Sequence, residues 1–335
     1  MRRSTVQLHA ISVHRESTAR INCENPSRAT ELDWPSLAAP AEHSSDMTRR
    51  LRLSILPQPD DTTCGPTCLQ AVYFYHGDRA RLADVIDGVR RLPEGGTLAP
   101  FLGAHALARG YLVKVIVYDL RVFDPSWFKT PVKPQAPADR PALVELPAPV
   151  DLQGKLIAQL SSRGGKRLGQ ETDAYLAFLA QGGQIEHVEL SSRLLVSYLE
   201  RGVPVIAGLS ATYLYGLPRE RPADDQFDDI DGRPAGHFVV LRGYDSATGM
   251  VSISDPMGPM LEPLHPFGSH EYEVHIERVI GAIMLGVLTG DANLLIVEKR
   301  PNTATDGSSD DLSSAASAAT HSVANESTAP SGNRS

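Results

Sequence analysis

The chain has 335 residues, of which 41% are hydrophobic, and it carries a formal net charge of -8 at pH 7. This length suits one large domain or two small ones, and the hydrophobic share suits a globular core. The acidic balance argues against a nucleic-acid partner, because phosphate binding needs clustered Lys and Arg. The richest basic runs, "TRRLRL" and "VRRL", are short and fit a solvated face.

The cysteine content indicates a reducing compartment. Cys23, Cys64 and Cys68 are too few for a disulfide framework, which favours a reduced, cytoplasmic protein. The first residues contain no apolar stretch typical of a secretion signal. The longest apolar run, "VIGAIMLGVL" (279–288), is too short to span a bilayer and predicts a buried helix or strand. We therefore expect no membrane segment.

The two ends of the chain differ in composition from its middle. Residues 1–46 lack sustained periodicity and are predicted to be disordered, with Met47 as a plausible true start. Residues 301–335 form a low-complexity polar tail, also predicted to be disordered. The expected folded body is 47–300, with a Pro-rich insertion around 129–149.

The first part of this body predicts mainly helices. In "CGPTCLQAVYFYHG" (64–77), apolar residues recur at helical spacing and Pro66 suits the first turn. "RARLADVIDGVRRL" (79–92) and "TLAPFLGAHALARG" (97–110) predict two further helices. "YLVKVIVYD" (111–119) is rich in β-branched residues and predicts a strand.

Strands dominate the later part of the body. Two more helices are expected there, followed by runs typical of strands. Helices first and strands late predict an α+β fold with segregated elements rather than alternating βαβ units. The expected helices are 172–183 and 191–202, and the expected strands are 203–210, 237–245, 250–256 and 293–299.

Cys64 stands where the first predicted helix begins, directly before Gly-Pro. A cysteine attacks as the thiolate, and a helix N-terminus stabilises that anion through its free N–H groups and dipole. On position alone, a nucleophile and a buried structural cysteine are both open for Cys64. Cys68 lies one turn later on the apolar face, so we assign it to the core.

A thiolate nucleophile needs an acid–base partner, and His237 is the candidate among eleven histidines. It opens the apolar run "HFVVLRGYD", which would place its side chain at a sheet end. Asp255 ends the next predicted strand, and a hairpin around "SATG" would bring it close to His237. A strand-edge histidine and a plain turn residue are the alternative interpretations. Gln58, six residues before Cys64, could supply an oxyanion donor.

Taken together, "QPDDTTCGPTCL" and "GHFVVLRGYDSATGMVSISDP" resemble the papain-like cysteine peptidases, most closely the bacteriocin-processing, double-glycine peptidase family and its stand-alone relatives. The resemblance implies a helical N-terminal part with Cys64 as nucleophile and a C-terminal antiparallel sheet with His237 and Asp255. His237 would be the general base and acid, Asp255 its orienting residue and Gln58 the oxyanion-hole residue. Classical members are fused to a membrane transporter, which this sequence lacks, so the substrate stays open.

Three functions fit these residues. The first is a thiol hydrolase acting on a peptide or small amide, without metal or cofactor. The second passes the same acyl group to an amine, as a transpeptidase or acyltransferase, and phytochelatin synthases show a similar Cys-His-Asp arrangement. The third is a non-catalytic peptide-binding module. A peptide ligase or a precursor peptide would be a fitting partner.

The acidic stretch "ADDQFDDIDGRPAGH" leads directly to His237. It does not fit the EF-hand template, because Phe227 occupies the first ligand position. One interpretation is a solvated loop. The other is a cleft rim that attracts a basic or amine-bearing substrate.

Overall fold

A computed structural model of the chain describes residues 49–93, 95–128, 151–224, 226–257 and 267–300. The predictions of disorder for residues 1–46 and 301–335, and of an insertion at 129–149, fall outside these ranges. Within the described ranges, no helix combines the length and the apolar character needed to cross a membrane.

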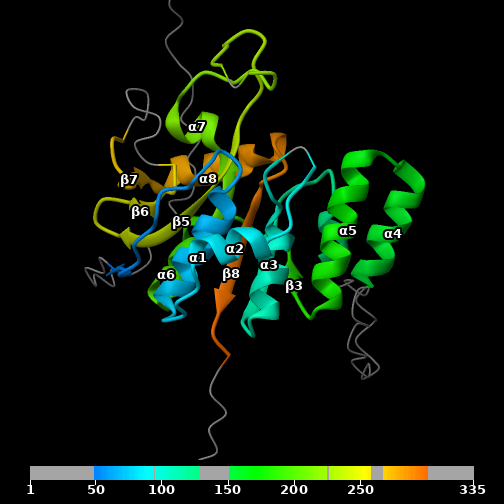
Figure 1. The fold of residues 1–335 in the computed structure, drawn as a ribbon, viewed down its shortest axis with the longest axis horizontal. Helices are drawn as coiled ribbons and strands as arrows, with labels where there is room; N and C mark the ends of the chain where they lie inside the picture. Colours follow the sequence, from blue (N-terminus) through cyan, green and yellow to red (C-terminus); the bar gives the residue numbers. More distant parts are fainter. Residues whose placement is uncertain (1–48, 94, 129–150, 225, 258–266, 301–335) are drawn as a thin grey trace, which may run out of the picture. The chain divides into compact units, whose positions relative to one another are not determined.

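The centre of the fold is one sheet in which the strands follow the spatial order β3-β2-β8-β4-β5-β6-β7, with β1 pairing beside β5 (Figure 1). Neighbouring strands run antiparallel except β2 and β3, which are parallel. Parallel neighbours need a long crossover, and helices α4 and α5 lie between these two in sequence. The strands are β1 Arg49–Arg50, β2 Leu112–Val117, β3 Gln184–Glu186, β4 Val205–Ser210, β5 Gly236–Asp245, β6 Met250–Ser254, β7 Glu271–His275 and β8 Asn293–Glu298.

Helices cover both faces of this sheet. Ile206, Phe238 and Val240 point into a core shared with α1 to α5, whereas Val205 and Val239 point into a second core with α6, α7 and α8. Burial on both faces explains why β4 and β5 read as continuous apolar runs instead of alternating ones. The helices are α1 Cys64–Tyr75, α2 Leu82–Gly88, α3 Ala99–Ala108, α4 Leu152–Arg163, α5 Lys166–Ala180, α6 Ser192–Glu200, α7 Ala211–Tyr215 and α8 Ile276–Leu285, with short 3-10 turns η1 Pro125–Phe128 and η3 Gly286–Leu288.

The element order confirms the predicted α+β class, with helices α1 to α3 first and most of the antiparallel sheet late. The hairpin of 237–245 with 250–254 is also confirmed, with Asp245 opposite Met250. The second predicted helix is shorter than expected, since α2 runs only from Leu82 to Gly88. The apolar run 279–288 is helical, in α8 and the turn η3. Helices α4 and α7 and strands β1, β3 and β7 were not predicted.

Candidate active site

Cys64 is the first residue of α1 and is partly exposed. The turn before it is fixed by Asp60, whose Oδ1 accepts hydrogen bonds from the backbone N–H and the hydroxyl of Thr62 at 2.8 and 2.7 Å. Thr63 donates its hydroxyl to the Asp60 carbonyl at 2.9 Å instead of capping the helix. The Cys64 sulfur is therefore placed at the positive end of the α1 dipole, where a thiolate is stabilised.

Gly65 allows the helix to start this close to the sheet. A Cβ atom at this position would lie 2.7 Å from Cγ2 of Thr97 and 3.3 Å from the ring of Phe238. Because that space is filled, only glycine lets α1 approach β5 here, and this approach brings Cys64 to the end of β5 that carries His237.

His237 is the second residue of β5 and its side chain is buried, with 2% of the residue exposed. Its Nε2 lies 2.9 Å from Oδ1 of Asp255. Cys64 lines the same cavity as His237, and its thiol acts on the pKa of the ring. The fold thus brings Cys64, His237 and Asp255 together, although Cys64 lies far from the other two in sequence.

Asp255 directly follows β6 and is fully buried. Its Oδ2 accepts hydrogen bonds from the hydroxyls of Tyr215 and Tyr272, both at 2.6 Å, and its Oδ1 also accepts the backbone N–H of Met257 at 2.9 Å. Four donors therefore converge on one carboxylate: His237, the two tyrosines and this amide. Such convergence fixes its orientation and stabilises its charged form.

The pKa values of the pair shift in opposite directions. Burial alone would lower the pKa of His237, but the charge and hydrogen bond of Asp255, followed by those of Cys64, outweigh it and raise that pKa. For Asp255, burial would raise the pKa, and the charge and hydrogen bond of His237 together with the two tyrosine hydroxyls lower it. Both shifts favour an imidazolium beside a carboxylate, which is the charge state that supports a neighbouring thiolate.

Cys68 behaves differently from Cys64. It is fully buried one turn along α1, and its thiol donates to the carbonyl of Phe238 at 3.2 Å. Burial, followed by the charges of Cys64 and Asp255, raises the pKa of the Cys68 thiol well above its usual value. A thiol in this state is protonated and a poor nucleophile, in agreement with the core role predicted for it.

Gln58 lies at the edge of the same cleft. Its backbone N–H donates to the carbonyl of Pro256 at 2.9 Å, which ties the loop before α1 to the segment after Asp255. Its side chain is only 2% exposed, and its Oε1 has no hydrogen-bond partner among the described residues. Because proteins rarely leave buried polar atoms unpaired, this amide is a candidate for contact with a ligand.

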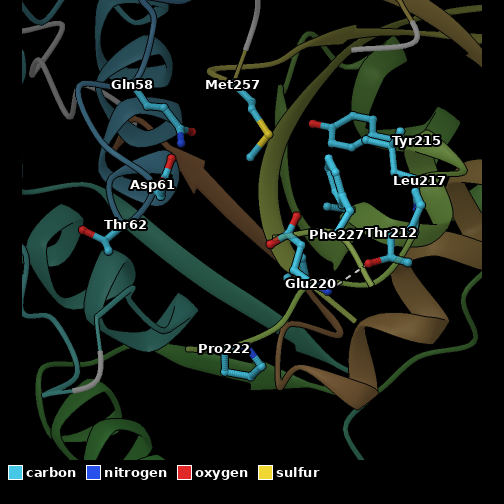
Figure 2. A pocket seen from close by; sticks show the side chains of 14 residues that line it. Gln58, Asp61, Thr62, Thr212, Tyr215, Leu217, Glu220, Pro222, Phe227 and Met257 are labelled. Carbon is cyan, nitrogen blue, oxygen red and sulfur yellow. Dashed lines mark hydrogen bonds between the residues drawn. The ribbon is translucent and has the colours of Figure 1, made fainter. Parts of the chain in front are cut away.

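Two adjoining cavities flank the nucleophile. The first, of about 500 Å³, is lined by Gln58, and Figure 2 shows this residue on one wall with Tyr215 and Leu217 on the opposite wall. The second, of about 470 Å³, is lined by both Cys64 and His237. Asp61, Pro222 and Gly236 line both cavities, so the two adjoin. An extended chain could cross the nucleophile from one cavity to the other.

Some carboxylates of the acidic stretch before His237 form ion pairs or hydrogen bonds with residues next to them in sequence. Asp224 and Asp228 pair with Arg221 at 2.6 and 3.8 Å, and Asp228 also accepts the backbone N–H groups of Ile230 and Asp231. Glu220 and Phe227, in contrast, line the first cavity. In the described part of the chain no group of His, Cys, Asp and Glu side chains has a geometry suited to a metal ion.

Sequence reasoning assigned no role to Tyr215, Tyr272 and Asp291. The two tyrosines come from α7 and β7, and Asp291 lies just before β8, so no local motif links them to Cys64. The alternation of polar and apolar residues in "EYEVH" was an available signal, because it predicts a strand that turns Tyr272 inward, as the structure shows.

Comparison with known proteins supports the same class. A family model described as the Peptidase_C39 like family matches residues 159–264. This segment contains His237 and Asp255 with β4, β5 and β6, whereas Cys64 and Gln58 precede it. The match confirms the resemblance to C39-like peptidases and supports a cysteine peptidase, at distant similarity.

Two solved structures resemble the chain weakly. One, described as a C39-like peptidase from Bacillus anthracis, has 14% sequence identity and a TM-score of 0.39 over 76% of this chain and 99% of that chain. The other is xylellain, a cysteine protease from Xylella fastidiosa, with 14% identity and a TM-score of 0.33 over 76% of this chain and 86% of that chain. At these scores neither structure carries an argument. No curated protein matches the sequence.

Proposed function

We propose that the protein is a cysteine peptidase or amide hydrolase in which Cys64, His237 and Asp255 form the catalytic triad. The observation that carries the proposal is the buried imidazole of His237, which lies 2.9 Å from Asp255 and lines the same cavity as Cys64. One carboxylate is enough to stabilise the charge of a buried histidine. A cysteine at a helix N-terminus in the same cavity is the further group that thiol catalysis requires.

The reaction follows from these positions. The thiolate of Cys64 attacks the substrate carbonyl carbon and forms a C–S bond, and the carbonyl oxygen becomes an oxyanion. The imidazolium of His237 then gives its proton to the leaving nitrogen as the C–N bond breaks. A water molecule, deprotonated by the now neutral imidazole, attacks the thioester, and the Cys64 thiolate leaves with the imidazolium restored.

Asp255 and Gln58 support these steps in different ways. Asp255 holds the ring through Nε2 and stabilises the imidazolium by its charge, without itself taking up the proton. Gln58 would donate its side-chain amide to the oxyanion, together with the Cys64 backbone N–H. Gln58 lines the cavity that adjoins the one holding Cys64, and this position supports the role.

The substrate in this proposal is a peptide or a small amide. The family resemblance implies cleavage after paired glycines, so a test library should include such peptides. The same acyl-enzyme could pass its acyl group to an amine, which would make the protein a transpeptidase or acyltransferase. The two chemistries differ only in whether water or an amine reaches the thioester.

The test is turnover of a blocked peptide library by the full chain and by a Cys64→Ala variant, with products followed by mass spectrometry. We expect the wild type to cleave the peptides and the variant not to cleave them. In the wild type, we also expect an acyl adduct on Cys64 that is lost by hydrolysis. Adducts captured faster by added glycinamide than by water would assign the transferase reaction. Binding without turnover in both proteins would instead indicate a non-catalytic module.

A further inference from the structure

The cavity that holds the nucleophile is lined by two carboxyl groups, Asp61 and Asp291, and by the guanidinium of Arg167. Asp291, in the turn between η3 and β8, lines the cavity of about 470 Å³ together with Cys64 and His237. Its backbone N–H donates to the carbonyl of Gly286 at 2.9 Å, and its own carbonyl accepts the N–H of Asn293 at 2.8 Å. The turn therefore holds the backbone of Asp291 in place, and the residue as a whole is partly exposed.

Two glycines in central strands make room for this residue. A Cβ atom at Gly236 would lie 1.9 Å from Oδ2 of Asp291, and a Cβ atom at Gly208 would lie 2.2 Å from its carbonyl oxygen. Glycine in a strand interior weakens the strand and marks a close approach of other atoms. Both glycines here lie against Asp291, and Gly236 directly precedes His237, so the carboxyl group is seated beside the catalytic histidine.

The cations around Asp291 are each engaged by another carboxylate. Arg167 on α5 pairs with Glu171 at 2.6 Å, and Arg121 after β2 pairs with Asp119, also at 2.6 Å. The ring of His237 is held by Asp255 at 2.9 Å. The negative charge of Asp291 is therefore only partly compensated by the protein itself.

The raised pKa of Asp291 agrees with a carboxyl group whose charge is only partly compensated. Burial raises its pKa to about 7, and the charge of Glu171 adds to the rise. A hydrogen bond from Thr289 and the charges of Arg167 and His237 lower the pKa, but by less. A cationic group that entered the cavity would favour the ionised carboxyl and would be bound by it.

We propose that Asp291 is a specificity-determining residue that binds a cationic group of the substrate, the ammonium or guanidinium of a Lys or Arg side chain, in the cavity beside Cys64. The inference rests on the proposed function, because it concerns the substrate of the same site. Phe238 and Leu92 also line this cavity and suit the aliphatic stem of such a side chain.

The test compares Lys with norleucine, which has a similar stem without the charge. Blocked decapeptides with a Gly-Gly core carry one Lys or one norleucine, scanned across every position, and kcat/KM is measured for wild type and Asp291→Asn. At the preferred position we expect Lys to exceed norleucine by about 10- to 100-fold in the wild type, the effect of one hydrogen bond to a charged group. Asp291→Asn should lose this preference, so that Lys and norleucine peptides have similar kcat/KM values in the variant.

The pH dependence of the wild type gives a measurement that does not depend on how a variant folds. Asp291 is charged above its pKa of about 7, so the Lys preference should increase as the pH rises through 7 and decrease below it. Glu220→Gln serves as the matched control, because Glu220 lines the other cavity and its neutralisation should leave the Lys preference unchanged. A preference that is independent of pH and of Asp291 would overturn the inference.

Binding of the same peptides to the inactive Cys64→Ala variant tests this inference separately from the proposed function. Selective binding of Lys peptides that is lost on adding Asp291→Asn would support the specificity residue even if no turnover were found. Turnover without any Lys preference would support the peptidase and refute the specificity residue. Peptides with a free instead of an acetylated N-terminus show whether a terminal amine replaces the side chain, and equal or absent binding of all peptides would refute the inference.

Discussion

Removal of the Tyr272 hydroxyl tests the hydrogen bonds that hold Asp255. In Tyr272→Phe, Oδ2 of Asp255 loses one of two hydroxyl donors at 2.6 Å, and because both residues are buried, water does not readily replace it. A hydrogen bond to a charged group contributes about 1.5–3 kcal/mol to stability. We therefore expect Tyr272→Phe to lower the free energy of unfolding at pH 7 by about that amount.

The pH dependence of this loss identifies its cause. The folded pKa of Asp255 is lowered, so the stability it contributes is present above the unfolded value and is lost as the pH falls through the folded value. Once the carboxyl is protonated, the tyrosine bond becomes an ordinary neutral one. The folded pKa of Asp255 is about 2, so the difference between wild type and Tyr272→Phe should shrink as the pH falls from about 4 toward about 2.

The assay is urea unfolding of both proteins across this pH range. Tyr75→Phe is the matched control, because the Tyr75 hydroxyl donates at 2.8 Å to the carbonyl of Gly202, which does not titrate. The control should cost about 0.5–1.5 kcal/mol at every pH. If the cost of Tyr272→Phe were equally independent of pH, the tyrosine would not act on the charge of Asp255.

Four further predictions concern single residues of the site and the ends of the chain. Gln58→Ala should lower kcat by about 10²–10³, the cost of one oxyanion donor, and Asp255→Asn should lower kcat but leave measurable activity. Steady-state kinetics on one substrate checks both, and an unchanged kcat in either variant would contradict the role of that residue. Gly236→Ala should lower the melting temperature, because its Cβ would lie 1.9 Å from Oδ2 of Asp291, whereas Gly169→Ala, with its nearest neighbour at 3.9 Å, should not; equal melting would contradict the packing argument. A chain of residues 47–300 should melt like the full chain, because neither end has an apolar sequence to bury, and a large loss would show that an end docks on the body.

The sequence predicted the parts of this fold whose signals are local. The β5–β6 hairpin is encoded by two apolar runs around a short turn, and this pairing is what allowed Asp255 to be placed near His237 before the structure was known. The start of α1 at Cys64 followed from Gly-Pro and helical periodicity in the same way. The catalytic roles of these residues stay predictions until kinetics test them.

The parts that were missed depend on packing between distant segments. Tyr215 and Tyr272 reach Asp255 from α7 and β7, and no sequence spacing relates those elements to one another. Asp291 reads as an ordinary turn residue until Gly208 and Gly236 are seen to make space for it. Tertiary contacts of this kind leave no periodic trace in a single sequence.

The most direct test of the central claim is the rate at which iodoacetamide alkylates Cys64, followed by mass spectrometry in wild type and in His237→Ala. Cys68 is the internal control, since its buried thiol has a raised pKa. We expect rapid labelling of Cys64 near neutral pH in the wild type, little labelling of Cys68, and a large fall in the Cys64 rate when the imidazole is removed. Equal labelling of Cys64 in both proteins, or preferential labelling of Cys68, would show that His237 does not activate Cys64 and that the proposed site is wrong.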